Sequence, residues 1–122
     1  MKTTEFLKAN ESFVANICHD RIGPIIFTDV LSGMGQEGFQ SIKFIHNDLI
    51  PPKTTVGIHQ HTGETFEEWY YCIEGSGTMH LDGEDYEMKS GDIAVCRGGG
   101  CHGISNDSDG DMRIIVICAM KS

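Results

Sequence analysis

Two histidines one residue apart, His59 and His61, are the first side chains in this sequence whose spacing could support metal chemistry. In a β-strand, residues two apart lie on the same face, so two imidazoles at this spacing can bind one metal ion. A pair of surface histidines would be the commoner explanation if nothing else accompanied them. The interpretation therefore depends on further ligands elsewhere in the chain.

Two adjacent glutamates, Glu67 and Glu68, follow the histidine pair and offer a carboxylate ligand. If they lie on a neighbouring strand, Glu68 shares a face with Tyr70 and Cys72, and Glu67 takes the opposite face. Alternation by itself does not decide which of the two glutamates faces the histidines.

A third histidine, His102, follows a run of three glycines at residues 98–100, and Cys101 stands beside it. A single histidine in a loop is usually an ordinary polar residue, and no base is identifiable that would activate Cys101. His46 and Tyr70 are candidates to line a cavity, although ordinary packing explains both equally well. The residue types alone leave the catalytic residues unknown.

The stretches that must position these residues are typical of short strands. β-Branched and aromatic residues dominate five of them: PIIFTDVLSG, FQSIKFIH, LIPPKTTVGIHQH, EEWYYCIEG and MRIIVICAM. Between two further strand-like runs, Asp82-Gly83 is the sequence expected of a type I′ hairpin turn, and Ser90-Gly91 marks the next turn. Many short strands with regular turns predict an all-β sandwich or barrel. Residues 3–15 are compatible with either a short helix or an extended arm.

The histidine pair and Glu68 resemble the first motif of the cupin superfamily, in which His-x-His is followed by a glutamate and then by a glycine. Six residues separate Glu68 from Gly75, as in the motif, and this spacing selects Glu68 rather than Glu67. The chain departs from the motif in two places. The glycine before the histidine pair lies too close to it, and the six residues between His61 and Glu68 are too many.

The stretch around His102 resembles the second cupin motif. Gly91, Gly99 and Asn106 stand at their expected distances from His102, and Arg97 replaces the proline of the motif. Two motifs in the right order, separated by a hairpin, make a more specific signal than either one alone.

The resemblance covers about residues 40–120 and implies an all-β fold, the double-stranded β-helix or cupin jelly-roll barrel. We expect the barrel to form a single domain over residues 25–122, after an N-terminal arm or short helix over residues 1–24. The resemblance also implies a metal ion inside the barrel, held by four ligands: His59, His61, Glu68 and His102. Three imidazoles and a carboxylate suit one divalent transition metal, such as Fe, Mn, Ni, Zn, Co or Cu, without selecting among them.

The resemblance further implies a small-molecule metalloenzyme of the oxygenase, lyase or isomerase type. The alternative is a non-catalytic module that uses the same barrel to bind or sense a small molecule. Catalysis would need an open position on the metal. Arg97 would place a cation near the mouth of the pocket, and we expect it to steer a carboxylate- or phosphate-bearing substrate.

The composition indicates which partners and which compartment to expect. A net charge of −9 disfavours binding to nucleic acid or to anionic lipid, and no apolar run is long enough to span a bilayer. Five cysteines, an odd number, and a start without an apolar leader favour reduced thiols and a cytoplasmic location. The stretch MRIIVICAM is apolar on both faces, and a barrel interior covers only one. We therefore expect a homodimer, which the cupin resemblance also implies.

Overall fold

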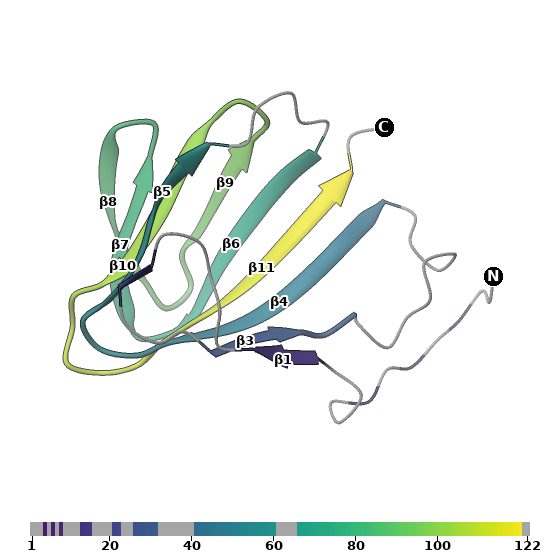
Figure 1. Ribbon diagram of the computed structural model, residues 1–122, viewed down its shortest axis with the longest axis horizontal. Helices are drawn as coiled ribbons and strands as arrows, with labels where there is room; N and C mark the ends of the chain where they lie inside the picture. The colour runs from purple at the N-terminus through teal and green to yellow at the C-terminus, as the bar shows by residue number, and fades with distance from the viewer. Residues whose placement is uncertain are drawn as a thin grey trace.

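The computed structural model describes residues 4, 6, 8, 13–15, 21–22, 26–31, 41–60 and 66–120, and all regular structure in this part of the chain is β-strand. The strands form two antiparallel sheets, one on each side of Figure 1. The predicted all-β jelly-roll barrel is therefore confirmed. No helix that is long and apolar enough to cross a membrane occurs among these residues.

The larger sheet has six strands in the order β1-β3-β4-β11-β6-β9. Their bounds in this order are Phe13–Ala15, Ile26–Asp29, Ile42–Ile50, Met112–Met120, Phe66–Glu74 and Ile93–Arg97. The smaller sheet has five strands in the order β2-β5-β10-β7-β8. Their bounds in this order are Arg21–Ile22, Thr54–Gln60, Cys101–Asn106, Ser76–Leu81 and Glu84–Lys89.

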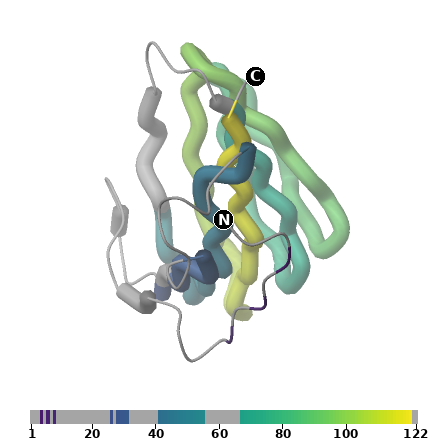
Figure 2. Tube along the Cα trace, turned by 90° about the vertical axis from the view of Figure 1, so that its right-hand side faces the viewer, coloured from purple at the N-terminus to yellow at the C-terminus, as the bar shows by residue number. Residues whose placement is uncertain are grey.

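The closing strand β11 lies between β4 and β6 in the larger sheet and runs through the middle of the side view in Figure 2. Its residues alternate in burial, as expected of a strand with one face on the core. Met112, Ile114, Val116 and Cys118 are buried, whereas the residues between them are only half-buried. The strand that is apolar on both faces therefore has one face on the interior and one on the outside of the sheet.

Three rows of residues cross the larger sheet on its interior face. Directly opposed residues of antiparallel strands lie on the same face, so the partners of the buried β11 residues on β4 and β6 face the interior too. We call them the first, second and third interior rows: Phe44–Cys118–Glu68, His46–Val116–Tyr70 and Asp48–Ile114–Cys72. Polar side chains therefore enter the barrel from both β4 and β6.

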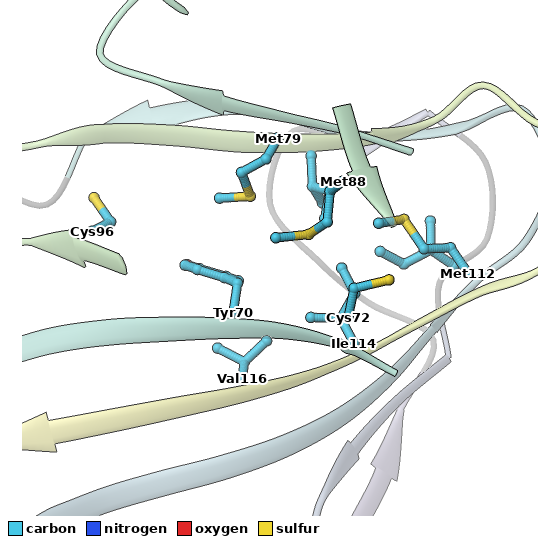
Figure 3. Packing of buried hydrophobic residues seen from close by; sticks show 10 residues of the cluster. Tyr70, Cys72, Met79, Met88, Cys96, Met112, Ile114 and Val116 are labelled. Atoms are coloured by element: carbon cyan, nitrogen blue, oxygen red, sulfur yellow. The ribbon is translucent and has the colours of Figure 1, made fainter. Parts of the chain in front are cut away.

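The apolar core lies between the two sheets. It is rich in sulfur-bearing side chains, which adapt to irregular gaps between strands. Its labelled members in Figure 3 are Tyr70, Cys72, Met79, Met88, Cys96, Met112, Ile114 and Val116. Met112 and Cys72 are fully buried, whereas Tyr70 and Cys96 lie nearer the other end of the cluster in this view. The first interior row lies beyond Tyr70, so the polar candidates gather away from the Met112 end.

The predicted type I′ turn at Asp82-Gly83 is confirmed. Both residues have positive φ, 48° and 84°, and the turn joins β7 to β8 with Leu81 opposite Glu84. A type I′ turn needs positive φ at both central positions, and its twist matches that of the strands it connects. Gly91 in the next predicted turn also has a positive φ, 99°.

The N-terminal residues contribute one short strand to each sheet. β1 pairs with β3 at the edge of the larger sheet, and β2 pairs with β5 at the edge of the smaller one. Of the two alternatives for residues 3–15, the described part at residues 13–15 is strand. The division into an arm over residues 1–24 and a barrel over residues 25–122 stays a prediction.

Candidate functional site

Glu68 on β6 is a buried carboxylate, with only 7% of the residue exposed. Its Oε2 accepts a hydrogen bond from the Tyr70 hydroxyl, two residues along the same face of the strand. The same oxygen lies 3.7 Å from Nε2 of His102, which belongs to the opposite sheet. Two potential metal-donor atoms from different sheets therefore converge inside the barrel.

Glu67 faces the outside of the sheet, where different partners hold it. Its Oε1 accepts a hydrogen bond of 3.0 Å from Trp69 Nε1, and its Oε2 lies 3.5 Å from Nε of Arg97. The predicted alternation, with Glu68 beside Tyr70 and Glu67 beside Trp69, is thus confirmed. The assignment of Glu68 as a metal ligand stays a prediction.

His102 on β10 is 3% exposed, and a polar neighbour lies near each of its ring nitrogens. Its Nδ1 lies 3.1 Å from Sγ of Cys96, which projects from β9, and its Nε2 faces Glu68. The ring also packs against Tyr70, with the two centroids 5.3 Å apart. The residue that looked like an ordinary loop histidine in the sequence is in fact a buried strand residue.

His59 on β5 pairs directly with His102 in the smaller sheet, next to an irregularity in the register. His61 lies outside the described residues. That His61 and His59 share a face therefore stays a prediction. Within the part of the chain that the structure describes, no three His, Cys, Asp or Glu side chains form a metal-binding group.

Burial changes the pKa of both aromatic candidates near this site. His46, in the second interior row, stacks on Phe44 with the ring centroids 4.1 Å apart. Desolvation lowers the pKa of His46 to about 4, so the imidazole is neutral near pH 7. Desolvation, and then the charge of Glu68, raises the pKa of Tyr70 well above its usual value. Tyr70 therefore stays protonated and remains a hydrogen-bond donor to Glu68.

The expectation that Arg97 places a cation at the mouth of the pocket needs correction. Its side chain is 67% exposed, and the guanidinium pairs with Glu67 and lies 6.0 Å from the centre of the Trp69 ring. Arg97 and Glu67 are direct partners in the ladder between β9 and β6, on the face opposite Glu68. Steering of an anion by Arg97 therefore has no support from its position.

Cys101, the other thiol near His102, is half-buried and its backbone N–H donates to Oδ1 of Asp82 over 2.8 Å. Sequence reasoning missed Cys96, whose thiol pKa is raised, first by burial and then by nearby acids including Asp82. It also missed Asp48 in the third interior row. Alternation along the stretch FIHND, which puts His46 and Asp48 on one face, is a signal that could have found it.

The comparison with known proteins identifies one family and several relatives. The model of the family described as "Cupin domain" matches residues 48–118. The "Oxalate-binding protein" of Thermotoga maritima is 35% identical over 68 residues, which are 56% of this chain and 54% of that protein. An uncharacterized protein of Methanocaldococcus jannaschii is 34% identical over 67 residues, 55% of this chain and 52% of the other. The matched part of this chain thus spans about half the length of each relative.

Solved structures resemble the chain over more of its length. The crystal structure of a predicted oxalate decarboxylase from Thermotoga maritima has a TM-score of 0.80, with 23% sequence identity. The match covers 95% of this chain and 99% of that one. At this level of identity the similarity establishes the fold and leaves the activity open.

Proposed function

Because this chain belongs to the cupin domain family, we propose that it binds a small molecule at a divalent metal ion inside its barrel. The proposed ligands are those named from the sequence: His59, His61, Glu68 and His102. The observation that carries the proposal is the approach of Glu68 Oε2 to His102 Nε2, 3.7 Å apart and both buried. A buried carboxylate beside a buried imidazole is costly unless a third charge or a proton compensates it, and a divalent cation would do so.

The surroundings of the two described ligands fit a metal. A histidine that binds metal through Nε2 carries its proton on Nδ1, where an acceptor holds the ring in place. Cys96 Sγ stands at that position beside His102. Tyr70 donates to Glu68 and restricts the orientation of its carboxylate. Both partners support the proposed ligands in the way that outer contacts support known metal sites.

The proposed ligand is a small carboxylic acid. The relative from Thermotoga maritima is named for binding oxalate, and a carboxylate is a suitable oxygen ligand for a divalent metal. The metal would supply a Lewis acid with a position open to the ligand. Tyr70 and Cys96 would keep Glu68 and His102 in position, and the apolar core would exclude water from one end of the barrel.

We propose a metalloenzyme of the oxygenase, lyase or isomerase type as the first possibility. The alternative is a non-catalytic module for binding or sensing. The names of the relatives favour neither, since one protein is called oxalate-binding and one structure a predicted oxalate decarboxylase. Turnover of oxalate by the metal-loaded protein would favour the enzyme, whereas stabilisation by oxalate without turnover with any of the six metals would favour the module.

The test of the metal site is elemental analysis of protein purified without chelator. We expect about one metal ion per chain in the wild type and a sharp loss in a double variant, His59→Ala with His61→Ala. His80→Ala is the matched control, because the ring of His80 is bonded to Asp85 and Ser105 outside this site. Full metal content in the double variant would overturn the proposed ligand set.

We also propose that the protein is a homodimer. One band of outward-facing residues crosses the larger sheet, and we call it the outer patch: Trp69, Tyr71, Ile93, Ile115 and Ile117. Tyr71 is 41% exposed and Ile93 is 57% exposed, on neighbouring strands. Apolar side chains gathered on one sheet face are typical of a contact with another protein surface.

A cytoplasmic location, without nucleic acid or membrane as a partner, completes the proposal. Cys72, Cys96 and Cys101 are free thiols, as in a reducing compartment. The net charge of −9 would repel phosphate backbones and anionic lipid. Retention of the purified protein on heparin or on anionic vesicles at physiological salt would contradict this part of the proposal.

A further inference from the structure

Asp48 is an acidic side chain that no part of the proposed metal site uses. It stands in the third interior row, opposite Ile114 of β11, and its other neighbour in the ladder is Phe27 of β3. Ile114 is only 1% exposed and belongs to the core, so Asp48 enters the barrel beside apolar side chains. Its Oδ1 is buried and has no hydrogen-bond partner within the described parts of the chain.

Asn106 shows how the same barrel satisfies another buried polar group. Its Nδ2 donates to the carbonyl oxygens of Ile50 and Gly110, both at 2.8 Å, and its Oδ1 accepts from the backbone N–H and the hydroxyl of Ser108. Native structures leave few buried polar atoms without a partner, and those that remain call for an explanation such as a ligand. Asp48 differs from Asn106 in this respect and is therefore a candidate contact for a ligand.

The groups around Asp48 can also form hydrogen bonds. His46 lies on the same face of β4, two residues away, as a neutral imidazole that offers one donor and one acceptor. The second interior row, His46–Val116–Tyr70, lies between Asp48 and the row of Glu68. Desolvation raises the pKa of Asp48 itself to about 7.

We propose that Asp48 is a ligand contact, and that its carboxyl group binds a hydroxyl group of a small hydroxy acid whose carboxylate would bind the proposed metal beside Glu68 and His102. This inference rests on the proposed function and specifies the class of its ligand. A hydroxyl group can donate to an ionised Asp48 and accept from a protonated one, so it satisfies either state. A second carboxylate on the ligand would instead meet the negative charges of Asp48 and Glu68.

The spacing of the interior rows indicates the size of the ligand. Asp48 stands four residues after Phe44, which belongs to the row of Glu68. Four residues of strand span about 13 Å, and the side chains at both ends shorten the gap that the ligand must bridge. A hydroxy acid with a chain of about six carbons can bridge such a gap, whereas a two-carbon acid such as oxalate would reach only the proposed metal.

D-gluconate and hexanoate are suitable probes, because both are six-carbon carboxylates and only gluconate carries hydroxyl groups. Calorimetric titration would give their dissociation constants for the wild type, for Asp48→Leu and for the control Asp109→Leu, since the side chain of Asp109 is 99% exposed. We expect gluconate to bind the wild type at least tenfold more tightly than hexanoate, as one good hydrogen bond to a charged group allows. Asp48→Leu should lose this preference, because an apolar side chain of similar size cannot hydrogen-bond a hydroxyl group, and Asp109→Leu should keep it.

A thermal denaturation series without ligand separates a binding role from a structural one. Replacement of a residue that supports the fold destabilises the protein. Replacement of a polar group that is buried in order to bind a ligand instead stabilises the protein in the absence of that ligand. We expect Asp48→Asn, and Asp48→Ser as a second variant, to melt several degrees above the wild type without ligand. A lower melting temperature in both variants would overturn the inference.

The outcomes also distinguish this inference from the proposed metal site. Equal binding of hexanoate and gluconate, absence of binding of both, or a preference that survives in Asp48→Leu would overturn the role of Asp48. Each of these results would leave the metal content, measured on the same samples, unaffected. If the wild-type protein contains no metal as purified but still prefers gluconate through Asp48, the metal site alone would be overturned.

Discussion

At the scale of single residues, strand alternation gives two adjacent glutamates different environments. Glu68 points into the barrel, where Tyr70 donates to it and His102 lies beside it. Glu67 points outward, where Trp69 and Arg97 hold it near solvent. A carboxylate in a dry interior attracts a cation far more strongly than one that is screened by water and already paired. The two positions therefore make a matched pair for testing the proposed metal site.

We expect Glu68→Gln to weaken metal binding by at least about tenfold, because a neutral amide is a poorer ligand than a carboxylate for a divalent ion. Glu67→Gln should leave the affinity nearly unchanged. Competition with a chelator of known affinity measures both variants on the same scale. A larger loss in Glu67→Gln than in Glu68→Gln would show that the outward-facing carboxylate is the one that binds metal.

The pKa values of Asp48 and His46 predict opposite effects of pH on stability. The pKa of Asp48 is about 7 in the folded protein and 3.8 in the unfolded chain. Burial of its negative charge therefore lowers the unfolding free energy by an amount that is absent below pH 4, grows as the pH rises towards 7 and then stays constant. A difference of about three pKa units corresponds to about 4 kcal/mol. His46 has a folded pKa of about 4 against 6.5 unfolded, so its smaller cost grows as the pH falls from 6.5 to 4.

Denaturant titrations of chelator-treated protein at several pH values would measure these effects. The gain in unfolding free energy of Asp48→Asn over the wild type should be near zero at pH 4 and largest above pH 7. The gain of His46→Gln should be near zero above pH 7 and largest at pH 4. Asp109→Asn should show neither trend. A pH-independent difference for Asp48→Asn would mean that its carboxyl group titrates normally in the folded protein.

At the scale of elements, the turns determine which strands face each other. Gly83 closes the hairpin of β7 and β8 with a φ of 84°, and a Cβ at this position would meet open space. Gly75 follows β6 with a φ of 80°, and a Cβ there would collide with the backbone carbonyl of Asp111. Gly83 is therefore required only for its conformation, whereas Gly75 is required for its conformation and for space. Gly75 also sets where the strand bearing Glu68 ends.

We expect Gly83→Ala to cost about 1 kcal/mol of unfolding free energy, the usual penalty of a side chain at positive φ. Gly75→Ala should cost about 3 kcal/mol or more, since the backbone must also move to relieve the clash. Urea denaturation of both variants gives the comparison. Equal costs would mean that the backbone near Asp111 yields easily and that Gly75 is needed for its φ alone.

At the scale of the whole molecule, the larger sheet has an apolar face on each side. The interior face carries the core and the interior rows, and the outer patch lies on the other side of the same strands. A barrel interior covers one face of its strands, so burial of the outer patch requires another surface. A second copy of the chain is the proposed cover, because a symmetric dimer would bury the same patch on both copies.

Light scattering at micromolar concentration should give about twice the chain mass of 13.4 kDa. Ile93→Asp places a charge in the outer patch and should shift the protein towards a monomer. Tyr86→Asp is the matched control, because Tyr86 is also exposed, at 49%, but lies on β8 of the other sheet. A monomeric wild type, or a dimer disrupted only by Tyr86→Asp, would contradict the proposed interface.

Much of the fold could be predicted from the sequence because its signals are local. The conformational demands of Asp82-Gly83 identify a hairpin within a few residues, and alternation in EEWYYC separates Glu68 from Glu67 without knowledge of any neighbour. The paired motifs around Glu68 and His102 carried the family resemblance, which the match to the cupin domain confirms. The His59-x-His61 part of the site stays a prediction, since His61 lies outside the described residues.

Only the tertiary structure could decide which side chains meet across strands, because such contacts depend on register and burial. Cys96 and His102 are six residues apart around a glycine loop, yet their contact requires two strands from different sheets to converge. Arg97 follows Cys96 directly and therefore, by alternation, takes the outer face. The cation that the motif spacing predicted at the pocket lies on the outside of the sheet. Only the tertiary structure places Asp48 opposite Ile114, where its Oδ1 is buried without a hydrogen-bond partner among the described residues. The sequence alone determined the turns and the faces of single strands, and packing between the sheets determined the chemistry of the interior.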